Sequence, residues 1–222
     1  MASKLIVIEG LDGSGKGTQS ALITQALSSR GYKVKKLTFP DYNSPTSALV
    51  KMYLGGELGD SPDAVNAYAA SVFYAVDRVA SFIKDWKRDY EECDYIVLDR
   101  YVTSNIIYQM SKVDDSERDE YIQWCEDLEY NRLGVPKPDV VVYLDMPPHV
   151  SQKLMSGRYN GDESKKDIHE KNMDFLLSCR KSALYALKKL SWVHLSCADG
   201  DNPKSIETIT AQILDIIDEK LR

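Results

Sequence analysis

The sequence has few of the residues that cross-link secreted proteins or bind metal ions. Its four cysteines lie far apart and form no C-x-x-C pair, and its three histidines show no metal-ligand spacing. This argues against disulfides and a zinc site, and is typical of reduced thiols. Long apolar runs are also missing: the run after Lys4 is too short for a signal peptide, and none approaches the length of a membrane span. We therefore expect a cytoplasmic protein without a membrane segment.

An excess of basic residues is missing as well. The 28 Lys and Arg residues are outnumbered by 34 Asp and Glu residues, which gives a net charge of −6. A general nucleic-acid binder needs a basic face, so we expect no nucleic-acid partner, although arginines can still converge in one pocket. The chain shows no internal repeat or low-complexity segment, and its 222 residues suffice for one well-filled α/β domain. We predict a single domain over residues 1–222, with a lid insertion at about 156–168.

The most informative stretch is residues 5–20. An apolar run, Leu5 to Ile8, predicts a buried strand, and a helical pattern begins at Lys16. Glycines between them let backbone N–H groups converge on one point, the helix adds the positive end of its dipole, and Lys16 adds a charge for β- and γ-phosphates. These features predict an ATP-binding P-loop, with a glycine-rich turn that binds nothing as the alternative. The candidate residues are Gly10, Gly13, Ser14, Gly15, Lys16, Gly17 and Thr18.

One position departs from the usual P-loop pattern, G-x-x-x-x-G-K-[ST]. Gly17 occupies the place of the hydroxyl residue, and Thr18 follows directly. Thr18 would then hold the magnesium shell, either directly or through water.

Strands and helices alternate along the chain. Apolar runs predict strands over residues 5–8, 33–39, 95–99, 140–145 and 192–196. Helical patterns cover residues 16–29, 48–54, 61–88, 116–132, 150–158, 167–190 and 203–221. The alternation predicts a P-loop NTPase-type three-layer α/β sandwich: a five-stranded parallel sheet with helices on both faces and a short lid. The loops after the first three strands should face one cleft.

A carboxylate and an arginine follow the third predicted strand. Asp99 ends the apolar run, and such an Asp beside a P-loop commonly helps to hold Mg²⁺. Arg100 would point a bidentate donor at a second phosphate. The alternatives are a helix cap for Asp99 and a simple ion pair for Arg100. Asp145, at the end of the fourth strand, we interpret as structural.

Residues 99–109, DRYVTSNIIYQ, resemble the signature segment of thymidylate kinases. The segments 8–16, 39–40, 73–78 and 138–145 are also similar to that family, in order over nearly the whole chain. The resemblance implies a dTMP kinase that moves the γ-phosphoryl of ATP to dTMP with Mg²⁺, giving dTDP and ADP and supporting dTTP synthesis. It also implies a homodimer.

The resemblance further assigns roles to individual residues. Asp12 would approach the sugar 3′-hydroxyl and the magnesium shell, Arg100 the acceptor phosphate, and Arg78 the base. Tyr74, one turn before Arg78, would stack on the ring, and the Asn105 amide would suit both N3 and O4 of thymine. Tyr108 would pack near C2′ and exclude a ribose hydroxyl. The implied substrate-binding set is Asp12, Phe39, Pro40, Tyr74, Arg78, Arg100, Ser104, Asn105, Tyr108 and Gln109, and the implied metal set is Thr18, Asp12 and Asp99.

The family also carries an arginine in the P-loop or the lid for the transferred group. Residues 11–14 contain none, so the resemblance implies Arg158 in the lid, with Lys165 and Lys166 as secondary candidates. Tyr42 stands where many relatives have an arginine, which leaves acceptor binding more dependent on Arg100. The implied catalytic residues are Lys16, Asp12, Asp99, Arg100 and Arg158, and Asp167 and Glu170 resemble the acidic pair after the lid.

Two other functions remain open from the sequence. A deoxynucleoside kinase shares a P-loop and an acidic–Arg pair, and would act on thymidine rather than its monophosphate. A nucleotide-binding module without catalysis is the second alternative. A GTPase is excluded because the chain has no Asn-Lys-x-Asp motif at a strand end.

Overall fold

The computed structural model describes residues 2–158, 168–169 and 172–221, with residues 155–158 described by their backbone only. Its centre is a sheet of five strands in the order β2-β3-β1-β4-β5, in which every neighbouring pair is parallel. The strands are β1 Lys4–Gly10, β2 Val34–Thr38, β3 Tyr95–Asp99, β4 Val140–Asp145 and β5 Val193–Ser196. All five predicted strands are confirmed.

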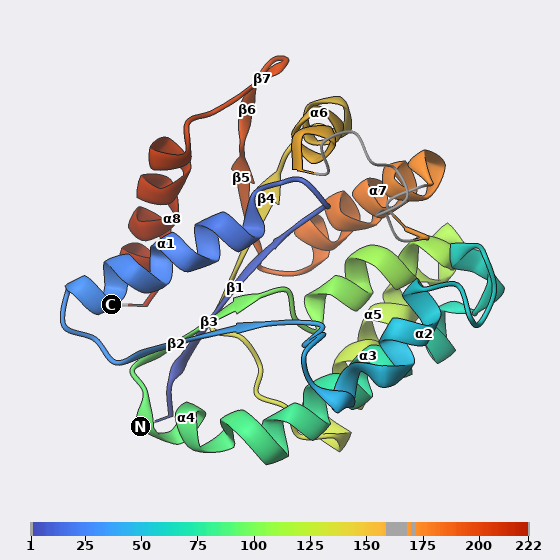
Figure 1. The fold of residues 1–222 in the computed structure, drawn as a ribbon, viewed down its shortest axis with the longest axis horizontal. Coiled ribbons are helices and arrows are strands. Elements are labelled where there is room, and N and C mark those ends of the chain that lie inside the picture. Colours follow the sequence, from blue (N-terminus) through green and yellow to red (C-terminus); the bar gives the residue numbers. More distant parts are fainter. Residues whose placement is uncertain (1, 159–167, 170–171, 222) are drawn as a thin grey trace.

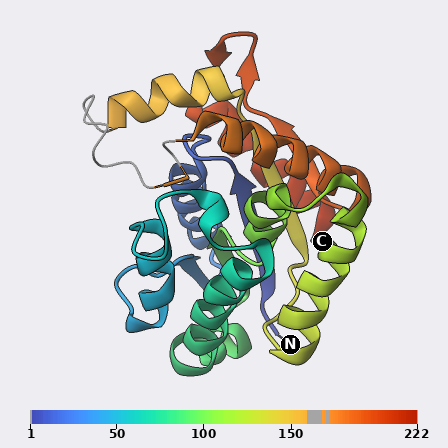
Figure 2. The same cartoon turned by 90° about the vertical axis from the view of Figure 1, so that its right-hand side faces the viewer.

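Helices cover both faces of this sheet (Figure 1). On one face, α1 (Lys16–Ser29) and α8 (Ile206–Lys220) lie side by side. On the other lie α3 (Ala67–Ser81), α4 (Lys87–Glu92), α5 (Arg118–Glu126) and α7 (Met173–Lys189). Figure 2 shows α5 and α7 on the same side, where the Tyr185 hydroxyl donates to Asp119 Oδ1 at 2.7 Å. Two further helices complete the fold: α2 (Ala48–Leu54) lies beside α3, whereas α6 (Pro148–Arg158) stands at the top of the view, near the end of β4.

The alternation of side chains along β1 builds a core on each face. Leu5 and Val7 join a cluster that contains Trp86 and Tyr121, whereas Ile6 and Ile8 join one that contains residues of α1 and α8. Successive side chains of a strand point to opposite faces, so a strand that is apolar at every position is covered twice. This explains why β1 and β4 are buried along nearly their whole length.

The prediction of one long helix over residues 61–88 is wrong. Residues Pro62–Ala64 form a separate 3₁₀ turn, and Val65 is extended. Asn66 then caps α3, because its side-chain oxygen accepts from the Ala69 N–H at 2.8 Å. A π-helical turn at Phe82–Trp86 separates α3 from α4 and buries both of its terminal aromatic side chains. Pro62 suggested an earlier start, but α3 begins after the Asn66 cap.

Two other expectations also need correction. Within the described residues, α7 begins at Met173 rather than at residue 167, because Asn172 caps it by accepting from the Phe175 N–H at 3.0 Å. The closing helix, predicted over residues 203–221, begins only at Ile206, because Pro203 belongs to a small antiparallel hairpin of β6 Ala198–Asp199 and β7 Asn202–Pro203. This hairpin turns at Gly200, whose φ is +60°.

Across the described part of the chain, none of the helices has both the length and the apolar character needed to cross a bilayer.

Candidate functional site

A cleft of about 1410 Å³ opens where the carboxyl ends of β1, β2 and β3 meet. The loops after these strands line it, as the parallel topology predicts. Most of the predicted site residues line this one cleft: Asp12, Gly13, Ser14, Gly15, Lys16, Gly17, Thr18, Phe39, Pro40, Tyr74, Arg78, Asp99, Arg100, Ser104, Asn105, Tyr108 and Gln109. Gly10 is not among the residues that line it. The Arg158 side chain and the residues Lys165, Lys166, Asp167 and Glu170 fall outside what the structure describes.

The P-loop leaves the start of α1 open to the cleft. Gly13 and Gly15 have φ of +78° and +88°, conformations that favour glycine. At Gly10, an added Cβ would lie 2.5 Å from Ser14 Oγ and 2.8 Å from the Leu144 carbonyl oxygen. No described side chain caps α1, so its first N–H groups remain available to an anion at the cleft.

Lys16 lies within this loop with its ammonium group held by the backbone. Its Nζ donates to the Leu11 carbonyl at 2.7 Å, and the side chain is almost fully buried. Burial and the nearby Arg100 charge lower the pKa of Lys16 to about 8, against the opposing effect of Asp12. The lysine therefore carries a charge that an anionic ligand would stabilise.

Arg100, Asp12 and Tyr108 form a cluster beside the P-loop. An Nη2 hydrogen of Arg100 is donated to Asp12 Oδ1, and the Tyr108 hydroxyl donates to Asp12 Oδ2 at 2.9 Å. The guanidinium carbon of Arg100 lies 5.0 Å from the centre of the Tyr108 ring. Burial favours a protonated Asp12, but Arg100, Lys16 and the Tyr108 hydroxyl outweigh it and lower the pKa of Asp12 to about 2. Asp12 is therefore a carboxylate at neutral pH.

The backbone at Arg100 is unusual. Its φ of +67° is the only positive value at a non-glycine residue in the described chain. Such conformations cost of order 1–3 kcal/mol and persist where the surroundings enforce them. Here the Arg100 N–H donates to the Ile8 carbonyl at 3.3 Å, which ties the loop back to β1.

Glu9 fixes the rest of that loop and was missed by the sequence analysis. It is fully buried, and its Oε1 accepts from the Tyr101 N–H at 3.2 Å and from the hydroxyls of Thr103 and Ser104 at 2.7 Å each. The Ser104 proton is thus committed to Glu9, and only an acceptor remains for a ligand. A charged residue inside an otherwise apolar strand was the available signal.

The base-reading candidates Arg78 and Asn105 converge on a second buried carboxylate, Glu129. Arg78 donates from Nε and Nη2 to the two Glu129 oxygens at 2.6 Å each. Asn105 Nδ2 donates to Glu129 Oε1 at 2.9 Å and to the Ser71 carbonyl at 3.2 Å. Both Nδ2 hydrogens are therefore engaged, so the expectation that this amide pairs with N3 and O4 together is wrong. Nothing in the sequence around Glu129 indicated its role.

The loop after β2 is held by Asp77, the residue before Arg78. Asp77 accepts from the Asp41 N–H at 3.1 Å and from the Thr46 hydroxyl at 2.6 Å. Burial raises the pKa of Asp77, although these two hydrogen bonds oppose the shift. Phe39 and Pro40, joined by a cis peptide bond, carry this loop into the cleft. Asp77 was also missed.

One edge of the cleft fits a phosphate-bound magnesium ion. The described residues include no group of three or more His, Cys, Asp or Glu side chains that could hold a metal by themselves. Asp99 lines the cleft: its backbone carbonyl accepts from the Phe39 N–H at 3.0 Å, and its carboxylate Oδ2 lies 3.3 Å from where a Cβ on Gly17 would be. Mg²⁺ in phosphate sites needs only one or two carboxylates besides phosphates and water, so the Asp99 carboxylate and the Thr18 hydroxyl are compatible with such a site. Both oxygens of Asp12 are already engaged.

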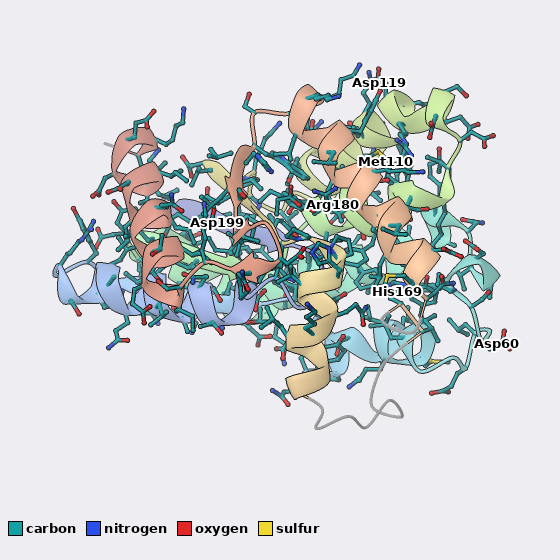
Figure 3. All side chains as sticks on the ribbon, turned by 90° about the horizontal axis from the view of Figure 1, so that it is seen from above. Asp60, Met110, Asp119, His169, Arg180 and Asp199 are labelled. Carbon is teal, nitrogen blue, oxygen red and sulfur yellow. The ribbon has the colours of Figure 1, made fainter. Side chains whose placement is uncertain are left out.

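A buried polar cluster closes the end of the cleft near α2. The Tyr53 hydroxyl lies 3.0 Å from His169 Nε2 and accepts from Lys112 Nζ at 2.8 Å. Figure 3 shows His169 at the end of α7 that faces α2. Burial and the Lys112 charge lower the pKa of His169 to about 3, so the ring is neutral. This cluster packs against the Tyr108 ring.

The opposite end of the cleft is more apolar and lies by α6 and the small hairpin. Met146, Leu154, Pro203 and Ile206 contribute to it. Asp145, nearby, is bound by Arg180 at 2.9 and 3.1 Å and by His194 Nε2 at 3.0 Å. Its partners support the structural interpretation of Asp145.

Comparison with known proteins identifies close counterparts of this fold and sequence. The family model described as thymidylate kinase matches residues 8–212. A thymidylate kinase of Mycobacterium tuberculosis is 33% identical over 186 residues, covering 82% of this chain and 84% of that protein. A probable thymidylate kinase of Thermococcus gammatolerans is 29% identical over 97% of this chain and 96% of its own length. The solved thymidylate kinase of Candida albicans superposes with a TM-score of 0.72 at 23% identity, covering 98% and 92% of the two chains.

Proposed function

Because this chain belongs to the thymidylate kinase family, it phosphorylates dTMP with ATP, and we propose that the cleft above carries out this transfer. The observation that carries the proposal is the position of the Arg100–Asp12–Tyr108 cluster beside the P-loop in one cleft. Lys16 can then bind the phosphates of ATP while Arg100 binds the phosphate of dTMP in the same cleft.

The donor side is the P-loop. Open N–H groups at the start of α1 and the buried Lys16 ammonium hold the β- and γ-phosphates of ATP. The apolar end of the cleft, with Met146 and Ile206, receives the donor base. Asp99 and Thr18 would hold Mg²⁺, which would neutralise phosphate charge. Asp99 is favoured over Asp12 for this task because the Asp12 oxygens already accept from Arg100 and Tyr108.

On the acceptor side, Arg100 binds the phosphate of dTMP. The guanidinium keeps two donors directed at a phosphate while Asp12 fixes its position. Because the pKa of Asp12 is about 2, its carboxylate accepts the sugar 3′-hydroxyl and does not donate a proton. We assign Tyr108, whose hydroxyl donates to Asp12, to the side of the sugar near C2′, where its ring excludes a ribose hydroxyl. Transfer then requires mainly positioning and charge neutralisation, since the acceptor phosphate oxygen is itself the nucleophile.

Tyr74 and Arg78, which lie on one face of α3, bind the thymine base. The Tyr74 ring lines the cleft one helical turn before Arg78 and meets Tyr53 edge to face, with ring centroids 6.4 Å apart. Gln109 adds an acceptor: its Oε1 is buried without a partner among the described residues, so it fits a ligand N–H or O–H.

We assign the remaining cation to Arg158, the last residue of α6. The P-loop contains no arginine, so a side chain from beyond it must meet the developing charge on the transferred group. R158A should lower kcat more than it raises the KM for dTMP, because its charge matters most during transfer. K153A, which removes an exposed cation from the same helix, is the matched control. A loss confined to the KM for dTMP would remove Arg158 from this role.

We also propose a homodimer that buries one face of α3. Tyr68, Val72 and Val76 lie four residues apart along α3 and are 38%, 40% and 40% exposed, and Ile83 beyond them is 71% exposed. Such a stripe of apolar side chains is typical of a protein interface. Light scattering should give twice the monomer mass for the wild type and the monomer mass for V72E/V76E. A monomeric wild type would contradict this assignment. Four buried free cysteines further support a reducing, cytoplasmic location.

The transfer itself is tested by incubating the protein with Mg²⁺–ATP and dTMP and separating the nucleotides. Equal amounts of ADP and dTDP are expected. Thymidine should not be phosphorylated, because it brings no phosphate to Arg100. Conversion of thymidine instead of dTMP would indicate a deoxynucleoside kinase, and absence of turnover with both would leave a nucleotide-binding module.

A further inference from the structure

The base end of the cleft is backed by a carboxylate that no solvent reaches. Glu129 has no exposed surface and lies in a π-helical turn, Asp127–Arg132, that continues α5. It accepts three hydrogen bonds: two from Arg78 on α3 and one from Asn105, which begins the π-helical turn Asn105–Gln109 after β3. Three segments that are distant in the sequence therefore meet at one group.

Glu129 fixes which donors Arg78 offers to the cleft. A guanidinium has five N–H donors in one plane. Two of them go to Glu129, and Nη1 donates to the Tyr101 carbonyl at 3.2 Å. By this count one N–H remains on each terminal nitrogen, and the described residues provide no acceptor for either. Since Arg78 lines the cleft, it presents hydrogen-bond donors there.

Glu129 also fixes the direction of the Asn105 amide. Both Nδ2 hydrogens are used, one by Glu129 Oε1 and one by the Ser71 carbonyl. A carboxylate has no hydrogen to donate, so the amide cannot turn its oxygen toward Glu129 without a repulsive contact. Asn105 lines the cleft and therefore offers it Oδ1, an acceptor.

We propose that Glu129 is a positioning residue that sets this donor–acceptor order and thereby makes the enzyme selective for thymine and uracil over cytosine nucleotides. The inference rests on the proposed dTMP kinase function. Thymine offers an N3–H donor to Asn105 Oδ1 and an O4 acceptor to Arg78. Cytosine has an acceptor at N3 and an amino donor at C4, so both contacts would be reversed. A site with fixed buried polar groups rejects such a mismatch strongly.

The substitution E129Q tests the proposal because it keeps the shape and adds a donor. A glutamine with its oxygen at the Oε2 position still accepts from Arg78 Nε, but its amino group then replaces Oε1, which accepts from both Arg78 Nη2 and Asn105 Nδ2 in the wild type. That amino group opposes both donors and can donate to Asn105 Oδ1. Asn105 can therefore turn its Oδ1 toward residue 129, with loss of its hydrogen bond to the Ser71 carbonyl, and present Nδ2 to the base, which suits N3 of cytosine. We expect kcat/KM for dTMP relative to dCMP to be at least 100-fold in the wild type and to fall at least tenfold in E129Q. The change should come mainly from KM, because the phosphate contacts are untouched.

Y121F is the matched control. The Tyr121 hydroxyl is buried beside the same network, bonded to Ser71 Oγ and to the Asn105 carbonyl, but it does not touch Glu129. Its removal should leave the dTMP to dCMP ratio within threefold of the wild type. A ratio that is unchanged in E129Q, or that falls equally in Y121F, would overturn the role of Glu129. A wild type that does not phosphorylate dTMP would instead refute the proposed function.

A second measurement serves if E129Q does not fold. In the ¹⁵N-labelled wild type, the Asn105 side-chain amide hydrogens, identified by their loss in N105L, should exchange slowly with solvent and show no nuclear Overhauser contact to bound dTMP. Contacts between these hydrogens and the base would mean that the amide faces the ligand with its nitrogen, and would overturn the proposal.

Discussion

Removing Arg100 should abolish acceptor turnover and spare the donor site. R100A removes the guanidinium group that is paired with Asp12 in the cleft beside the P-loop. Hydrogen bonds to charged groups contribute about 1.5–3 kcal/mol each. Two bonds to the acceptor phosphate, taken near the lower bound because Asp12 shares the guanidinium, amount to about 3–4 kcal/mol. At about 1.4 kcal/mol per factor of ten, kcat/KM for dTMP should fall about 100- to 1,000-fold.

The assay is a coupled measurement of ADP formation with dTMP as the varied substrate, combined with direct titration of ATP binding. ATP affinity should stay within about twofold, because Lys16 is held by the Leu11 carbonyl and not by Arg100. R100K should fall between wild type and R100A, since an ammonium keeps the charge but cannot bind a phosphate bidentately. R132A, which removes a largely exposed arginine paired with Asp127, should leave both quantities unchanged. A loss below fivefold in R100A, or an equal loss of ATP affinity, would refute this reasoning.

Two further predictions concern the donor side. Because the pKa of Lys16 is lowered to about 8, its charge is lost as the pH rises through that value, and kcat/KM for ATP should decrease above pH 8. K16R stays charged and should lack this decrease, whatever its absolute rate; a wild-type profile that is flat up to pH 10 would contradict the assignment. G17A places a Cβ 3.3 Å from Asp99 Oδ2 and should raise the Mg²⁺ concentration needed for half-maximal rate several-fold. The thermal stability of G17A should be equal to or higher than that of the wild type, since Ala is favoured over Gly in a helix by roughly 0.5–1 kcal/mol. An unchanged Mg²⁺ requirement would contradict the assignment of Asp99 as a Mg²⁺ ligand.

The sequence was sufficient for the sheet and the P-loop because both depend on local patterns. An apolar run followed by a glycine-rich turn specified β1 and the P-loop, and four further apolar runs specified the other strands. The cleft followed from topology, since the carboxyl ends of parallel strands share an edge. The starts of three helices were misjudged: α3 begins at the Asn66 cap rather than at Pro62, α7 at the Asn172 cap, and α8 after the small hairpin.

The carboxylates that organise the site could not be predicted, because their partners are remote in sequence. Glu9 binds a loop that begins 92 residues later, and Arg78 meets Glu129 across 51 residues. Nothing in a single sequence distinguishes such a pair from two surface charges. The direction of the Asn105 amide is likewise set by Glu129 and Ser71, so the residue type alone suggested a contact that the structure does not permit.

The most direct test of the account is a comparison of kcat/KM for dTMP, dUMP, dCMP, AMP and thymidine with ATP and Mg²⁺. We predict the highest value for dTMP, a smaller loss for dUMP because one methyl in an apolar pocket is worth about 1–3 kcal/mol, and losses of at least 100-fold for dCMP and thymidine. AMP should be a poor acceptor because adenine offers an acceptor at N1 and an amino donor at C6, the reverse of what Asn105 Oδ1 and Arg78 require. Preference for AMP or thymidine over dTMP would contradict the assignment of Arg100 and the base site.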